Sequence, residues 1–92
     1  MYIHIGGEYV VSDKLIIAVI DLNQVHPHQA EMKRYMLAQE RSGRMEYIGK
    51  EIPQSLIVTM ERLYASPLSS HTLYERIRKA AGTPETATTK TV

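Results

Sequence analysis

The segment of residues 15–21, LIIAVID, constrains the fold of this chain more than any other. Its apolar residues follow one another without polar alternation, which is typical of a strand that is covered on both faces. Asp21 and Asn23 interrupt the run, which is therefore far shorter than the roughly 20 apolar residues of a membrane-spanning helix. The pattern predicts a central strand, packed against a helix on one face and against a second helix or another subunit on the other.

Short β-branched and aromatic runs predict the other strands. Residues 2–5 and 8–12 are separated by Gly6 and Gly7, which tolerate the positive φ angles of a tight hairpin turn. This glycine pair is not a phosphate-binding loop, because the further glycines and the Lys-Ser/Thr ending of such loops are missing. Three more strands are predicted at residues 44–48, 55–60 and 62–65.

The spacing of apolar residues predicts one helix over residues 27–41 and a second over residues 69–81. Pro27 suits the first turn of the first helix, because the fixed φ angle of proline is compatible with that position. In the second helix, Leu73 and Ile77 lie four residues apart and form the start of a stripe that faces the sheet.

These elements predict a small single α+β domain over residues 1–82, with a mainly antiparallel, twisted sheet of about five to six short strands and two helices. Residues 83–92 hold almost no core-forming side chain and are expected to be a disordered tail. A domain of this size buries only about 60–65% of its unfolded surface, so association with copies of itself is expected. The chain has no cysteine and no secretion signal, which favours a cytoplasmic protein without a membrane partner.

The known catalytic motifs are missing from this sequence. It contains no G-x-S-x-G elbow, no G-x-x-x-x-G-K-[ST] loop, no H-E-x-x-H and no cysteine nucleophile, and its ten carboxylates are scattered singly. We therefore predict that the chain is not an enzyme, and that it uses no cofactor and no small-molecule substrate.

His26 and His28 flank Pro27, and two imidazoles this close could share one metal ion in an extended segment. A tetrahedral zinc site needs a third and usually a fourth ligand, and no cysteine or second H-x-H supplies them. An exposed pair of histidines at the start of a helix is the simpler interpretation, so no metal site is predicted.

The stretch SPLSS at residues 66–70 precedes the second helix and admits two interpretations. Its serine hydroxyls can cap the helix, with Ser69, Ser70 or a Thr72 and Glu75 capping box as alternatives. They could also hold a phosphate at the helix N-terminus. Capping accounts for every residue of the stretch without a ligand, and it is the interpretation we favour.

Basic side chains flank several of the predicted turns. Lys14 lies at the turn after the second strand, and Arg44 and Lys50 lie on either side of the strand that follows the first helix. Cations that project from the loops of a rigid sheet can hold nucleic-acid phosphates. With a net charge of only +1, an ordinary mixed-charge surface is the alternative. Multiple copies of the chain would favour nucleic acid, because phosphate contacts accumulate.

Three segments carry a resemblance to a known family. MYIHIGGEYVVS at residues 1–12, LIVT at 56–59 and especially LYASPLSSHTLYERI at 63–77 resemble the extracellular matrix regulator (Rem) family of spore-forming bacteria, and its B-type branch in particular. The resemblance covers residues 1 to about 79. It implies a DNA-binding domain with a LytTR-like fold, which assembles into rings and activates transcription of biofilm-matrix genes.

The resemblance also implies positions for DNA contact. In the A-type branch, arginines at the turn after the second strand and in a later G-R-R turn carry this role. Lys14 in SDKL matches the first position, and Gly49, Lys50 and Glu51 match the second. Lysine lacks the bidentate fork of arginine, and the carboxylate of Glu51 would repel a phosphate.

Two hypotheses follow for the function. The leading one is a DNA-binding transcriptional regulator that works as a homo-oligomer and contacts the DNA backbone through Lys14, Lys50 and Arg44. The alternative is a structural or interaction subunit without DNA affinity, which would modulate a partner such as a related A-type regulator through its sheet edge.

Overall fold

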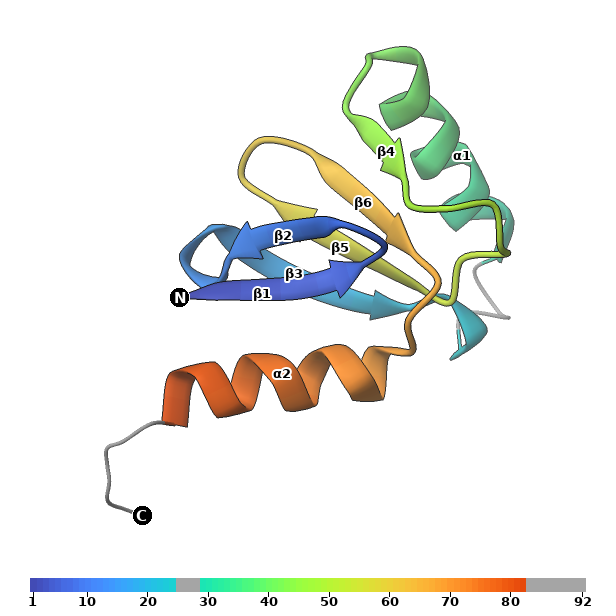
Figure 1. Cartoon of the computed structure of the whole chain (residues 1–92). Coiled ribbons are helices and arrows are strands. Elements are labelled where there is room, and N and C mark those ends of the chain that lie inside the picture. The colour runs from blue at the N-terminus through green and yellow to red at the C-terminus, as the bar shows by residue number, and fades with distance from the viewer. Residues whose placement is uncertain (25–28, 83–92) are drawn as a thin grey trace.

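The computed structural model describes residues 1–24 and 29–82 (Figure 1). The histidine pair, the start predicted for the first helix and the tail predicted at residues 83–92 lie outside the described residues. The described residues form six strands and two helices: β1 (Tyr2–Gly6), β2 (Tyr9–Ser12), β3 (Ile16–Asp21), α1 (Gln29–Arg41), β4 (Met45–Tyr47), β5 (Ser55–Thr59), β6 (Leu63–Ser66) and α2 (Ser70–Gly82). Two short 3-10 helices, η1 (Asp13–Leu15) and η2 (Leu22–Gln24), flank β3.

The prediction of a small α+β domain is confirmed, and each predicted strand is present within one or two residues of its expected bounds. The arrangement of the strands differs from the prediction. They form a two-stranded sheet, β1-β2, and a separate four-stranded sheet in the order β3-β5-β6-β4. Strand β4 pairs in parallel with β6, because α1 carries the chain from one edge of the sheet to the other before β4 begins.

The prediction that residues 15–21 form a central strand is wrong. Strand β3 lies at the edge of the four-stranded sheet, and β5 and β6 occupy its centre. The register of β3 against β5 shifts between Ile16 and Ala18, and the side chain of Ile17 is 65% exposed. In this protein an apolar run without alternation forms an edge strand. Its composition resembles that of the central strand β5, so composition does not distinguish the two positions.

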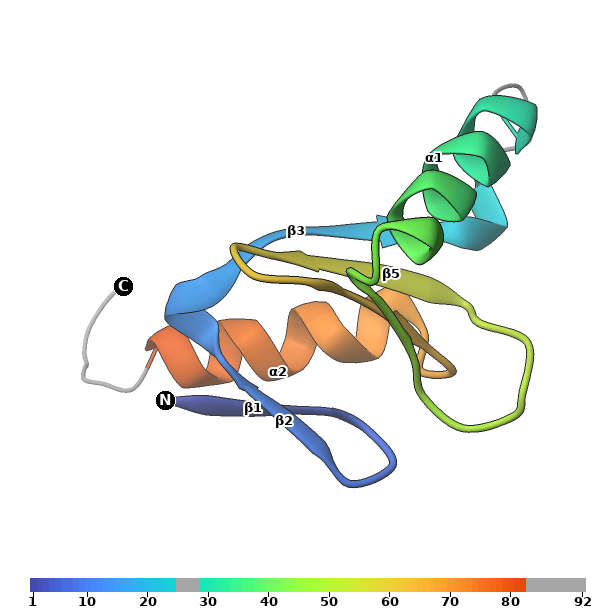
Figure 2. The same cartoon turned by 90° about the horizontal axis from the view of Figure 1, so that it is seen from above.

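The four-stranded sheet is covered on both faces. Figure 2 shows α1 on one side of this sheet, and α2 with the β1-β2 hairpin on the other. Met32 and Met36 of α1 pack against a cluster centred on Leu56 and Leu63. The larger core lies on the opposite face and joins hairpin, sheet and α2 through the following buried side chains: Ile3, Ile5, Val11, Val19, Ile48, Ile57 and Leu73.

A buried hydrogen bond joins the hairpin to the four-stranded sheet. The hydroxyl of Ser66 in β6 donates to the carbonyl of Ile5 in β1 at 2.6 Å, and it accepts from the main-chain N–H of Leu68 at 3.0 Å. Gly6 follows directly, with a φ of 123°, and a Cβ there would meet the side chains of Ile48, Pro67 and Ser66 at 3.3 Å. The hairpin turn is therefore held tightly against the end of β6.

Candidate nucleic-acid interface

Lys14 projects from a turn that is fixed on both sides. Ser12 caps η1 by accepting a hydrogen bond from the N–H of Lys14 at 3.3 Å. The N–H of Asp13 donates to the carbonyl of Met1 at 2.9 Å, and the Asp13 carboxylate pairs with the terminal ammonium of Met1 at 3.1 Å. The ammonium largely satisfies this acid, so the exposed Lys14 side chain has no ion-pair partner among the described residues.

Arg44 lies at the same end of the four-stranded sheet as Lys14. The carbonyl of Leu15, next to Lys14, accepts from the N–H of Met60 at 3.1 Å in the β5-β6 turn. On the other side of this turn, the N–H of Leu63 donates to the carbonyl of Arg44 at 2.8 Å. The turn between β5 and β6 thus lies between two exposed cations that main-chain hydrogen bonds fix in place.

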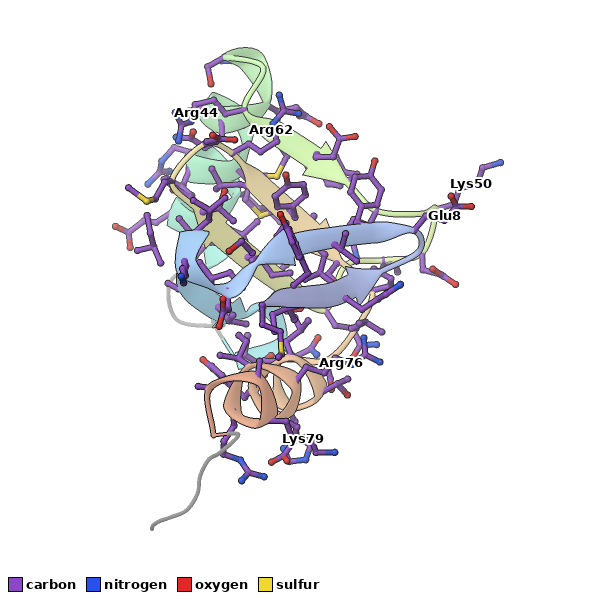
Figure 3. All side chains as sticks on the ribbon, turned by 60° about the vertical axis from the view of Figure 1, so that its left-hand side comes forward. Glu8, Arg44, Lys50, Arg62, Arg76 and Lys79 are labelled. Atoms are coloured by element: carbon purple, nitrogen blue, oxygen red, sulfur yellow. The ribbon has the colours of Figure 1, made fainter. Side chains whose placement is uncertain are left out.

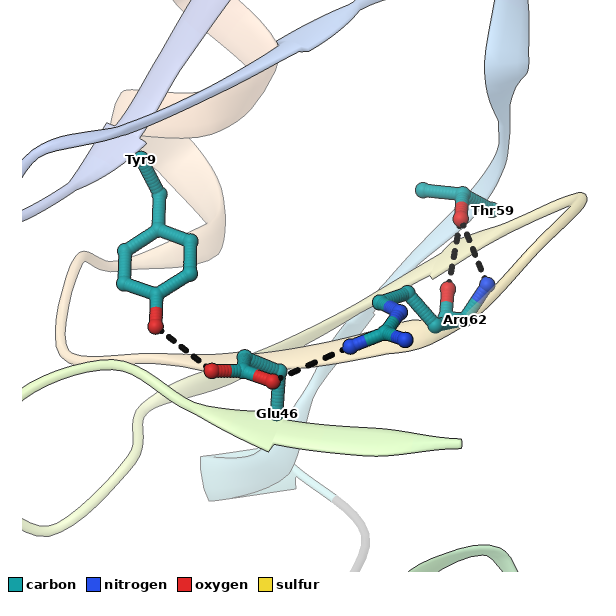
Figure 4. Close-up of polar contacts among 4 residues, drawn as sticks. All are labelled: Tyr9, Glu46, Thr59 and Arg62. Atoms are coloured by element: carbon teal, nitrogen blue, oxygen red, sulfur yellow. Dashed lines mark hydrogen bonds and ion pairs between the residues drawn. The ribbon is translucent and has the colours of Figure 1, made fainter. Parts of the chain in front are cut away.

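Arg62 in the same turn is engaged with an acid (Figure 4). Its Nη1 lies 3.1 Å from Oε1 of Glu46, and the hydroxyl of Tyr9 donates to Oε2 of the same carboxylate at 2.6 Å. This hydrogen bond, with burial as a smaller cause, raises the pKa of Tyr9 above its usual value of 10.0. Glu46 therefore links the hairpin to the β5-β6 turn and neutralises Arg62, while Arg44 has no ion-pair partner among the described residues.

Lys50 lies at the opposite end of the domain. Its loop runs beside the hairpin turn, and Gly6, Gly7, Glu51 and Ile52 line the hollow between the two. Strand β1 has five residues, so the hairpin turn lies about 16 Å from the Lys14 end at about 3.3 Å per residue. Figure 3 shows Arg44 and Arg62 together, with Lys50 far from both. One copy of the chain therefore brings Lys14 and Arg44 to one end and leaves Lys50 at the other.

The serine stretch before α2 acts as a helix cap. The hydroxyl of Ser69 accepts from the N–H of Thr72 at 3.2 Å, and the carbonyl of Ser69 accepts from the N–H of Leu73 at 3.1 Å. Glu75 does not complete a capping box but pairs with Arg78, whose hydrogen bond lowers the pKa of Glu75 below its usual 4.5. Capping by Ser69, one of the predicted alternatives, is confirmed.

The described residues offer neither a metal-binding cluster nor a membrane-spanning helix. Residues 1–24 and 29–82 contain no group of three or more histidine, cysteine, aspartate or glutamate side chains placed to hold a metal ion. Within the same residues, neither helix has the length and apolar character that crossing a membrane requires.

Sequence reasoning missed two features of this surface. One is the Tyr9, Glu46 and Arg62 network, whose members come from three strands or turns distant in sequence. The other is the position of Arg76 and Lys79 of α2, which line a groove beside β1 together with residues of that strand. A local pattern cannot reveal either feature, because each depends on how α2 and the hairpin pack.

The described residues form a small α+β domain with exposed cations at both ends of its four-stranded sheet. The chain matches the RemA-like family model, described as extracellular matrix regulatory protein A-like, over residues 2–77. It is also 32% identical over 76 residues to extracellular matrix regulatory protein B of Bacillus subtilis (strain 168). The aligned region covers 83% of this chain and 89% of the relative. The chain belongs to this family of extracellular matrix regulators, as its sequence resemblance predicted.

Proposed function

We propose that the protein is a DNA-binding transcriptional regulator of extracellular-matrix (biofilm) genes, and that it works as a homo-oligomer. The relative from Bacillus subtilis is named as a regulator of the extracellular matrix, which supports the biological role. The observation that carries the DNA-binding part is the placement of Lys14 and Arg44. Both are exposed cations without an acidic partner among the described residues, and both lie on main-chain positions fixed at one end of the sheet.

Lys50 contributes from the opposite end of the domain in this proposal. Because one copy cannot present Lys14 and Lys50 side by side, neighbouring copies bring the two loops together along the duplex. Each phosphate contact adds about one unit to the salt slope of binding, so repeated weak contacts yield affinity that a monomer lacks.

The edge strand β3 supports the association of copies. An exposed sheet edge usually carries charges or prolines that prevent pairing with another chain. Strand β3 instead leaves Ile17 65% exposed, and Met60 in the adjacent turn is also 65% exposed. Because β3 is an outer strand of its sheet within the described residues, these exposed apolar side chains lie at an edge that suits an interface with a second copy.

A titration of long duplex DNA at about 50 mM salt tests the DNA-binding part, since phosphate contacts are strongest at low salt. We expect the wild-type protein to bind, and the Lys14→Ala plus Lys50→Ala variant to bind at least about tenfold more weakly, with a salt slope smaller by about two units. Mass measurement by light scattering tests the oligomer. A wild-type protein that ignores DNA, or a particle of one subunit, would contradict the proposal.

The acid beside Lys50 favours a second candidate function. Glu51 is exposed next to Lys50, and it lines the hollow at the hairpin turn. A carboxylate at this position repels a phosphate, and it suits a subunit that binds another protein. In that case the chain joins a related A-type regulator and has no DNA affinity of its own. Co-purification with that regulator, together with indifference to DNA at low salt, would favour this candidate.

A further inference from the structure

A groove with a volume of about 270 Å³ runs between β1 and α2. Strand β1 contributes the exposed side chains of Tyr2 and His4, and α2 contributes Arg76 and Lys79. No carboxylate is among the described residues that line it. Figure 3 shows Arg76 and Lys79 on the α2 side of the domain, away from Arg44 and Arg62. The groove is therefore a concave surface whose charged side chains are all cationic.

Within residues 1–24 and 29–82, no strand pairs with the edge of β1 that forms one wall of the groove. Residues of an antiparallel pair alternate between bonded and non-bonded positions. The N–H of Asp13 bonds to the carbonyl of Met1, and the register places Ile3 opposite Val11. Met1 and Ile3 are therefore the positions whose main-chain groups bond to β2. The main-chain groups of Tyr2 and His4, which lie between and after them, point away from β2 and toward α2.

Arg76 is held in place by this free edge. Its Nη1 donates to the carbonyl of His4 at 2.8 Å, across 72 positions of sequence. A guanidinium has five N–H donors, so one bond to a carbonyl leaves the rest of the fork available. The bond also removes part of the rotational freedom that a surface arginine would otherwise lose on binding a ligand. Arg76 is thus a pre-oriented cation at the wall of the groove.

Cations in the last turns of a helix are common, because they oppose the negative end of the helix dipole. Arg78 is accounted for within its own helix, since it also pairs with Glu75 one turn earlier. Arg76 does not pair along the helix but reaches to another element. Lys79 lies one turn further on and lines the same groove. It forms no ion pair among the described residues, and its charge contributes to the lowered pKa of Glu75 on the same helix.

The groove also borders the Lys14 turn. Met1 lines the groove, and its ammonium and carbonyl are both bonded to Asp13, the residue before Lys14. The carboxylate of Asp13 is engaged by that ammonium and does not oppose an anion. Lys14, Arg76 and Lys79 therefore lie on one side of the domain, around the N-terminal end of β1.

We propose that the β1-α2 groove holds a backbone phosphate of DNA, which continues the contact that begins at Lys14. This inference rests on the proposed function. The guanidinium of Arg76 binds two phosphate oxygens through its remaining N–H donors, and Lys79 adds a second positive charge. The ring of Tyr2, 73% exposed, packs against the neighbouring sugar or base.

The test is a titration of fluorescently labelled duplex DNA at several salt concentrations. The variants are Arg76→Gln, Lys79→Gln and the double substitution, with Arg78→Gln as the matched control. The control removes the same charge from the same helix outside the groove. We expect each groove variant to weaken binding about three- to tenfold and to reduce the salt slope by about one unit, and the control to leave the slope unchanged.

Two further measurements keep the result interpretable if a variant folds poorly. Arg76→Lys retains the charge and loses the fork, so binding should fall between those of wild type and Arg76→Gln. Amide chemical shifts of the wild-type protein during a short-duplex titration should move at Tyr2, His4 and the C-terminal half of α2.

The possible outcomes separate this inference from the proposed function. If Lys14→Ala weakens DNA binding and the double groove variant binds like wild type, the groove proposal fails and the proposed function stands. If the wild-type protein does not bind duplex DNA at all, both fail. If an acidic peptide moves the groove amides and DNA does not, the groove is a protein-binding site and the phosphate proposal is overturned.

Discussion

The hydroxyl of Tyr74 in α2 donates a hydrogen bond to the main-chain carbonyl of Val19 in β3, with an oxygen–oxygen distance of 2.8 Å. Arg76, two residues further along α2, bonds in the same way to the carbonyl of His4 in β1. The two side chains thus cap one edge carbonyl in each of the two sheets. Helix α2 joins these sheets through polar contacts at their edges as well as through the apolar core beneath it.

Replacement of Tyr74 by phenylalanine should remove the edge bond without changing the packing of the ring. We expect the free energy of unfolding to fall by about 1 kcal/mol, because a net hydrogen bond is lost and the Val19 carbonyl can regain water at the edge. Urea denaturation measures this change. Tyr35→Phe is the control, since Tyr35 is exposed on α1 without such a bond among the described contacts. Equal effects of the two variants would contradict a special role for Tyr74.

Replacement of Ile17 by lysine should reduce self-association. The substitution places a charge on an open strand edge, which is the device that natural sheets use against pairing with other chains. Because the Ile17 side chain is already 65% exposed, the monomer should lose less than about 0.5 kcal/mol of stability. Light scattering should show a smaller particle. Ile52→Lys changes a side chain that is 87% exposed in a loop, and it should leave the particle mass unaltered.

Replacement of Ser66 by alanine should loosen the hairpin from the four-stranded sheet. The Ser66 side chain is fully buried, and its loss leaves the Ile5 carbonyl and the Leu68 N–H without their partner. We expect a loss of about 1–3 kcal/mol, the usual cost of unsatisfied buried polar groups. Hydrogen exchange should become faster in β1 and β2 than in β5. Ser42→Ala removes an exposed hydroxyl bond to Gln39 and should have a much smaller effect.

The pairing of Glu75 with Arg78 predicts a small acid-sensitive contribution to stability. The Arg78 hydrogen bond lowers the pKa of Glu75 in the folded state below 4.5. The contribution is therefore fully present above the unfolded pKa and is lost as the pH falls through the lower folded value. In Arg78→Gln, carboxyl NMR should show Glu75 titrating closer to 4.5. An unchanged titration in this variant would mean that Arg78 does not cause the shift.

How far the sequence predicts this structure depends on whether a feature is local. The bounds of β5 and α2 follow from residues within the segment itself. The cap is predicted only as a choice among Ser69, Ser70 and a Thr72 and Glu75 box, and the fold selects Ser69. The edge position of β3 does not, because its apolar residues resemble those of β5 and only the path of the chain through α1 decides which strand is central. The position of Lys14 at a turn follows from the residues around it, whereas the groove position of Arg76 depends on a contact to His4 from the other end of the chain.

Replacement of Glu51 by glutamine tests whether the Lys50 loop contacts DNA. Glu51 is exposed beside Lys50, so its carboxylate should repel a phosphate that approaches this loop. Removal of one like charge near the surface is worth about 0.5–1 kcal/mol, so we expect the affinity for duplex DNA to rise about two- to fivefold at low salt. The gain should shrink as salt is added, because screening weakens exposed charges. It should also be smaller when Lys50 is replaced by alanine in the same protein. If Glu51→Gln binds DNA no better than wild type while Lys14→Ala still weakens binding, the Lys50 loop lies off the DNA and the contact belongs to the Lys14 end alone.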